Sequence, residues 1–216
     1  MRNFVFLIFL KKGYKMSEVS FKQRVINDLI AVAPRFKSTF IDKEYLIFSS
    51  KMVNRNYYII SAVPGNFMHL TGIRLSSPID FYNKCINGTL IESDINIPSN
   101  KEKGSIRRKI NALPNLVNIF NNEVLVEENF SHNNVHCSLA STDLDITIGF
   151  CKPNIDNVVK PMTLLKGYNG FSDNSPVAEL ILERKRGERL FSKILCGDKD
   201  TILSNGLASL VLPELL

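Results

Sequence analysis

The N-terminal part of the chain changes from a helical to a strand-like hydrophobic pattern. Over residues 17–33, apolar side chains recur at helical spacing while polar residues occupy the other faces, which predicts an amphipathic helix that ends near Pro34. Two β-rich runs follow at 44–48 and 57–60, and a polar segment separates them. These runs predict an antiparallel hairpin.

Two further helices are predicted in the middle of the chain. Ser77 and Pro78 are typical of an N-cap and a first helical position, and Gly88 is expected to end that helix. The next helix begins in the basic segment 101–109 and reaches Pro114. That proline either kinks the helix or starts a new turn.

Strand patterns dominate the rest of the chain. Three strands are expected in apolar or alternating runs, at residues 124–126, 137–140 and 146–150. Residues 158–165 predict another strand, and Pro161 would place it at a sheet edge. The clearest hairpin covers 177–195, with a glycine in its turn. Together these elements predict an α+β fold, with N-terminal and middle helices packed on a small antiparallel sheet.

The first fifteen residues are treated separately from the fold. Their apolar run, residues 4–10, is too short to span a bilayer, and the features of a signal peptide are missing. The codons for residues 11–13 resemble a bacterial ribosome-binding sequence at a plausible distance before Met16. We therefore expect residues 1–15 to be a translated leader or a mis-assigned start, and residues 16–216 to form one domain with an apolar C-terminal tail.

Composition excludes disorder and favours a soluble protein with an anionic partner. The chain has 216 residues, of which 44% are hydrophobic and 22% charged, as in ordinary globular proteins. The formal charge of +6 favours nucleic acid or an anionic membrane face. The four cysteines lie far apart without a Cys-x-x-Cys motif, so we expect reduced thiols and a cytoplasmic location. The short apolar run at residues 4–10 predicts no membrane insertion.

The segment 66–73 concentrates residue types that can carry chemistry. His69 can exchange protons near neutral pH, and Thr71 adds a hydroxyl group. Gly72 permits a tight backbone path, and Arg74 adds a fixed positive charge. The alternative is that His69 is a capped or core histidine beside a turn.

A second pair of histidines has the spacing of two zinc ligands on a helix. However, Asn133 and Asn134 between His132 and His136 predict a loop, and no third ligand is evident. Surface turn residues are the better interpretation. We therefore predict no metal site.

Two basic clusters could follow a phosphate backbone. The first consists of Lys101, Lys103, Arg107, Arg108 and Lys109, and the second of Arg184, Lys185, Arg186, Arg189 and Lys193. A solvated helix face and a solvated hairpin tip are the alternatives. The chain contains no Walker loop, dinucleotide-binding fingerprint, nucleophile elbow or kinase signature.

The segment Phe67-Met68-His69-Leu70-Thr71-Gly72-Ile73 resembles a group of phage-associated nuclease-like proteins. That group belongs to the superfamily of barnase, EndoU, colicin and RelE-type nucleases, called BECR. Three other features fit the resemblance: the helix headed by Ser77 and Pro78, the helix that ends at 112–116, and the hairpin that closes on 191–195. The resemblance covers residues 17–200.

The resemblance implies an α+β fold whose antiparallel sheet faces RNA. It also implies metal-independent RNA cleavage, without a cofactor, by a toxin, phage or mobile-element protein. The expected partners are RNA, with tRNA as a candidate, and an antitoxin or another protein. The alternative is a catalytically inactive module that binds RNA or a partner protein.

Metal-free RNA cleavage needs a base for the ribose 2′-hydroxyl, an acid for the leaving oxygen and cations for the phosphoryl charge. The candidate catalytic residues are His69, Thr71, Ser192 and Lys193. The candidate nucleic-acid contacts are Arg74, Arg107, Arg108, Lys109, Arg184, Arg186 and Arg189. Regular strand alternation would place Ser192 and Lys193 on opposite faces, so both can reach one site only across a bulge.

Overall fold

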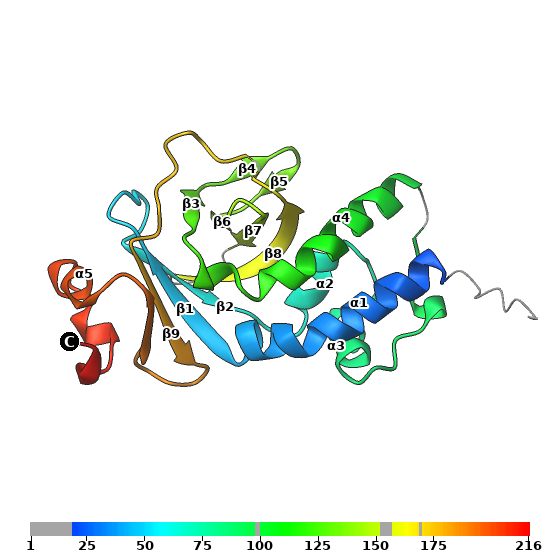
Figure 1. Cartoon of the computed structure of the whole chain (residues 1–216), viewed down its shortest axis with the longest axis horizontal. Coiled ribbons are helices and arrows are strands. Elements are labelled where there is room, and N and C mark those ends of the chain that lie inside the picture. Colours follow the sequence, from blue (N-terminus) through cyan, green and yellow to red (C-terminus); the bar gives the residue numbers. More distant parts are fainter. Residues whose placement is uncertain (1–18, 98–99, 152–156, 169) are drawn as a thin grey trace, which may run out of the picture.

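A large curled sheet dominates the protein (Figure 1). The computed structural model describes residues 19–97, 100–151, 157–168 and 170–216. The expected leader, residues 1–15, lies outside the described residues. Mixed helices and strands confirm the α+β class.

The helices follow the predicted order, with two additions. They are α1 (Phe21–Phe36), α2 (Asn66–Thr71), α3 (Pro78–Ile86), α4 (Asn100–Leu116) and α5 (Lys199–Ser204). The Ser77 hydroxyl accepts the Asp80 amide at the start of α3, as expected of an N-cap. The helix α4 continues through Pro114, and a separate 3₁₀ turn follows at Ile119–Asn121. The additions are α2, which contains His69, and α5 near the C-terminus.

The strands form one mixed sheet and a small separate hairpin. The sheet order is β10-β9-β1-β2-β8-β7-β6-β3, and β4 and β5 form the hairpin. Their bounds are β1 (Lys43–Phe48), β2 (Tyr57–Ser61), β3 (Leu125–Glu128), β4 (Ser131–His132), β5 (Val135–His136), β6 (Leu139–Thr142), β7 (Ile146–Cys151), β8 (Val158–Lys166), β9 (Leu180–Lys185) and β10 (Lys193–Cys196). All neighbouring strands of the sheet pair antiparallel except β2 and β8, which are parallel.

The sheet is larger than the small antiparallel sheet that the sequence predicts. Its eight strands curl into a half-barrel. Leu125 on β3 forms an isolated antiparallel bridge with Val177, just before β9, so the two ends of the curl approach each other. Curling is the usual outcome when strand twist accumulates over many strands.

The prediction that Pro161 marks an edge strand is wrong. The strand β8 lies between β2 and β7 in the middle of the sheet. The β7–β8 register shifts so that Gly149 faces Thr163 and Phe150 faces Pro161, which leaves Met162 as an extra residue. This β-bulge accommodates an imino nitrogen that cannot donate to the ladder.

Two apolar layers cover opposite parts of the sheet. In the main core, α2 and α4 pack on the sheet and α1 and α3 pack on these helices, around buried rings such as Phe36, Phe67 and Phe81. A second cluster on β1 and β9 includes Phe191 and Val211, so the apolar C-terminal tail is a packed segment. Within the described ranges, no helix is both long and apolar enough to cross a membrane.

Candidate functional site

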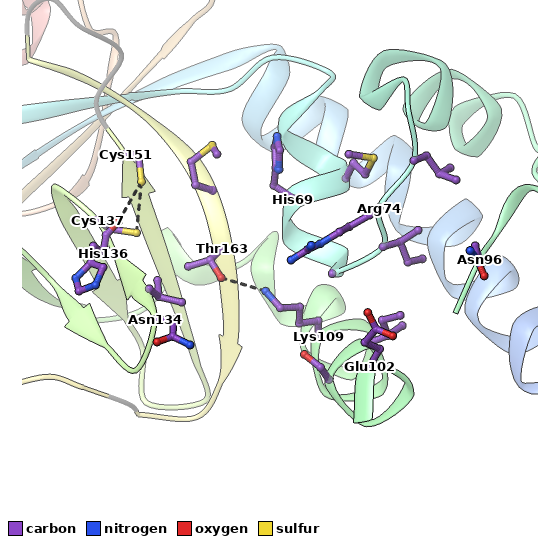
Figure 2. Close-up of a pocket in the computed structure, with 18 residues that line it drawn as sticks. His69, Arg74, Asn96, Glu102, Lys109, Asn134, His136, Cys137, Cys151 and Thr163 are labelled. Atoms are coloured by element: carbon purple, nitrogen blue, oxygen red, sulfur yellow. Dashed lines mark hydrogen bonds between the residues drawn. The ribbon is translucent and has the colours of Figure 1, made fainter. Parts of the chain in front are cut away.

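A pocket of about 840 Å³ opens between the helices α2 and α4 and the strands β7 and β8. Its lining comes from segments that are far apart in the chain (Figure 2). The labelled lining residues are His69, Arg74, Asn96, Glu102, Lys109, Asn134, His136, Cys137, Cys151 and Thr163. Of the candidate residues from the sequence, His69, Arg74 and Lys109 meet here.

The His-Leu-Thr-Gly motif forms the end of α2. His69 is exposed on this helix and lines the pocket, so it is not a core histidine. The buried Thr71 hydroxyl donates to the Met68 carbonyl at 2.7 Å and accepts the Ile73 amide at 3.0 Å. Gly72 then ends the helix with a φ of 76°, a left-handed conformation that favours glycine. Thr71 and Gly72 therefore fix the backbone conformation at the end of α2, beside the pocket.

Gly72 also makes room for Lys109, which crosses from α4. A Cβ atom at position 72 would lie only 2.9 Å from the Lys109 Cδ atom. The Lys109 amine reaches β8 and donates a hydrogen bond to the Thr163 hydroxyl at 3.0 Å. The motif thus forms the wall along which the Lys109 side chain lies.

Burial changes the chemistry of the Lys109 amine. Desolvation lowers its pKa to about 8, and the nearby Cys137 opposes this effect. An amine with this pKa can donate or accept a proton near neutral pH. The sequence analysis placed Lys109 among residues that contact the phosphate backbone, and only the fold shows that its amine is buried.

Two thiols lie on the sheet side of the same pocket. The sulfur atoms of Cys137 and Cys151 are 3.6 Å apart and hydrogen-bonded. Hydrogen bonding between the two thiols lowers the pKa of Cys151, whereas the same interaction and burial raise the pKa of Cys137. Cys151 is therefore the thiol that ionises first.

A second pocket, of about 340 Å³, adjoins the first along α4. Both pockets include Ser105, Lys109 and Val135 in their lining. Arg108, His132 and Lys166 line only the second one, and among the described residues none of its lining side chains is acidic. The two pockets form one groove with a basic end.

A comparison with protein-family models identifies the family of the chain. The family described as "phage-Barnase-EndoU-ColicinE5/D-RelE like nuclease4" matches residues 28–186, more than half of the chain. The chain belongs to this BECR nuclease-like family. The match confirms the resemblance seen in the sequence. No curated protein and no solved structure matches the chain.

The residues matched by the family model include the elements that form the pocket. Residues 28–186 include α2, α4, β7 and β8. Ser192 and Lys193 lie beyond the matched residues, just before and at the start of β10. Three strands separate β10 from β8, and neither residue lines the pocket. The structure therefore does not bring Ser192 and Lys193 to His69.

Several candidate arginines of the BECR chain contact other parts of the protein. Arg107 lies over the Phe21 ring of α1, with its guanidinium carbon 5.4 Å from the ring centroid. Arg184 pairs with Glu44 at 2.7 Å, stacks on Phe191 and donates to the Arg189 carbonyl. Arg186 donates to the carbonyls of Ile41 and Ala62. These guanidinium groups join neighbouring segments and do not line the pocket.

The histidine pair of the BECR chain lies in a hairpin, not on a helix. His132 belongs to β4 and His136 to β5, and the His136 Nδ1 atom is 3.1 Å from the Ser131 hydroxyl. Over the ranges that the structure describes, no three His, Cys, Asp or Glu side chains gather in a way that could hold a metal ion. His136 lines the first pocket and His132 the second.

Proposed function

We propose that this protein cleaves RNA without a metal and that the pocket between α2, α4 and β8 is its active site. One observation carries the proposal: the Lys109 amine is buried, has a lowered pKa and shares a pocket with His69 and Arg74. Membership of a nuclease-like family makes a nucleic acid the expected substrate. Perturbed amines in pockets are typical of catalytic groups.

His69, Lys109 and Arg74 would each have a separate role in an in-line phosphoryl transfer. Figure 2 shows the Arg74 guanidinium between His69 on one side and Lys109 on the other. His69 would accept the proton of the ribose 2′-hydroxyl while that oxygen attacks phosphorus. Lys109, as an ammonium ion, would give its proton to the leaving 5′-oxygen. Arg74 would stabilise the charge on the non-bridging oxygens.

This reaction explains the choice of RNA over DNA. Only RNA supplies the 2′-hydroxyl that replaces a water or metal-bound nucleophile. The products would be a 2′,3′-cyclic phosphate and a 5′-hydroxyl. One proton enters on His69 and one leaves from Lys109, so the two residues must exchange a proton with solvent before the next turnover.

The basic end of the groove supports a polynucleotide substrate over a small phosphate ester. Arg108 and His132 line this end beside Lys166, beyond the proposed reacting centre. A strand whose scissile phosphate lies between His69 and Lys109 could continue there, with its phosphates near these cations. The positive net charge of the chain would attract the strand to the groove.

The test is cleavage of total RNA and of tRNA in the presence of EDTA. Wild-type protein should produce fragments with 2′,3′-cyclic phosphate ends, while His69→Ala and Lys109→Met should each lose most of this activity. A general acid or base typically contributes 10²–10⁴-fold to the rate, so we expect losses of about that size. Lys193→Ala is the matched control, because Lys193 is an exposed lysine outside the pocket.

Two results would reject the proposal in different ways. Full activity of His69→Ala would remove the mechanism. No cleavage by wild type, together with tight and salt-sensitive RNA binding, would instead identify an inactive module that binds RNA. A DNA oligonucleotide of the same sequence should remain intact in either case.

A further inference from the structure

Two thiols at the wall of the pocket are arranged for a reaction that RNA cleavage does not use. Cys137 precedes β6, and Cys151 ends β7, the neighbouring strand. Their sulfur atoms are 3.6 Å apart, and both line the pocket. All four cysteines of the chain are free thiols.

We propose that Cys137 and Cys151 form an oxidation site, at which a hydroperoxide converts the two thiols into a reversible disulfide between the segment before β6 and the end of β7. Cys151 is the half-buried member that meets the oxidant, and Cys137 is the buried member that resolves the intermediate. The proposal does not depend on whether the protein cleaves RNA.

The reaction balances with a hydroperoxide as the two-electron oxidant. The Cys151 thiolate attacks one peroxide oxygen, the O–O bond breaks, and Cys151 becomes a sulfenic acid while hydroxide or alkoxide leaves. The Cys137 sulfur then attacks the Cys151 sulfur and displaces the hydroxyl group, which leaves as water with the Cys137 proton. The two sulfurs together lose two electrons, and the peroxide gains them.

The local structure requires only a small movement for this closure. A disulfide bond is about 2.05 Å long, so the sulfurs must approach by about 1.5 Å. Gly149 leaves the space that Cys137 occupies, because a Cβ atom at position 149 would lie 2.6 Å from the Cys137 sulfur. Hydrogen bonding with Cys137 favours the thiolate of Cys151, which is the reactive form.

The other two thiols have different surroundings. Cys85 is fully buried in the main core, where desolvation raises its pKa to about 12. Cys196 lies on β10, and its thiol donates to the Ala178 carbonyl. Neither lines the pocket, so both serve as internal controls.

Disulfide formation would also change the electrostatics of the pocket. The reduced pair can ionise beside Lys109, whereas a disulfide carries no titratable proton. Oxidation therefore removes a negative charge from a pocket that we expect to hold phosphate.

The experiment treats the reduced full-length protein with hydrogen peroxide, blocks the remaining thiols with an alkylating reagent under denaturing conditions, and maps the peptides. The number of alkylated thiols should fall from four to two. A disulfide-linked peptide pair should contain Cys137 and Cys151, and dithiothreitol should restore four. Cys196→Ser should form the same disulfide, while Cys137→Ser should stop at a Cys151 sulfenic acid that a diketone reagent traps.

Three outcomes would overturn the proposal. In the first, wild type keeps four alkylatable thiols after peroxide treatment. In the second, Cys151 oxidises to the sulfinic acid while Cys137 remains a thiol. In the third, the peptide map shows a disulfide to Cys85 or Cys196. Because the decisive observation is made on wild-type protein, it does not depend on the folding of a variant.

Discussion

The buried Lys109 amine should make the folded protein less stable than it would be without it. Burial lowers its pKa from 10.5 to about 8, so the ammonium form is less favourable in the folded state than in water. At about 1.4 kcal/mol per tenfold change in the equilibrium, that difference corresponds to about 3 kcal/mol at neutral pH. The hydrogen bond to Thr163 offsets about 1 kcal/mol. We expect Lys109→Met to raise the free energy of unfolding by about 2 kcal/mol at pH 7.

The effect should depend on pH in a defined direction. Because the pKa of Lys109 is lower in the folded state, the unfolded chain binds more protons between about pH 8 and the ordinary value of 10.5. Wild-type stability therefore contains a contribution that increases with pH through this window. Lys109→Met should therefore gain the full stability difference over wild type below about pH 8. Near pH 9.5 the buried amine destabilises the wild type by only about 1.4 kcal/mol, so the difference between the two proteins should be small.

Urea denaturation of both proteins at pH 7 and near pH 9.5 measures the two differences. Arg107→Met is the matched control, because Arg107 is an exposed cation on the same helix and lines neither pocket. It should change stability by less than about 1 kcal/mol at either pH. If Lys109→Met is less stable than wild type at pH 7, the amine stabilises the fold and the reasoning is refuted.

Three further results are expected. Gly72→Ala should lower the free energy of unfolding, measured by urea denaturation, by about 2 kcal/mol, and Gly88→Ala should lower it by only about 1 kcal/mol. Both residues have a positive φ, but only a Cβ atom at position 72 would meet Lys109. Equal losses for the two variants would contradict the close approach of Lys109 to Gly72. RNA cleavage should decline above about pH 8 as Lys109 loses its proton, and an activity that stays constant through pH 9 would exclude Lys109 as the acid. Arg184→Gln should lower the free energy of unfolding by about 1–3 kcal/mol, because Glu44 loses its partner, and should leave RNA affinity unchanged; weaker RNA binding would indicate a nucleic-acid contact instead.

Local patterns account for most of the elements that the sequence predicts correctly. The N-cap at Ser77 and the apolar spacing of α1 act through neighbouring residues, so they can be read without knowledge of the fold. The same holds for the hairpins β1–β2 and β9–β10, whose strands are close in sequence. The short helix α2 has no such pattern of its own, and it is stabilised by its contacts with β8 and α4.

The position of β8 could not be read from the sequence. Pro161 excludes one backbone donor from the ladder, and this favours an edge strand when each strand is considered alone. The structure instead uses a bulge at Met162, which restores the pairing on both sides of the proline. The register between β7 and β8 determines whether a strand with this proline can be central, and that register exists only in the assembled sheet.

At the candidate site, too, some features follow from the sequence and others only from the tertiary structure. The sequence by itself determined the family and singled out the segment around His69, because both depend on a short continuous run of residues. Only the tertiary structure decided that Lys109, and not Lys193, lines the same pocket as His69. The choice depends on burial: an amine changes its pKa when distant segments, here α2 and β8, exclude water from it.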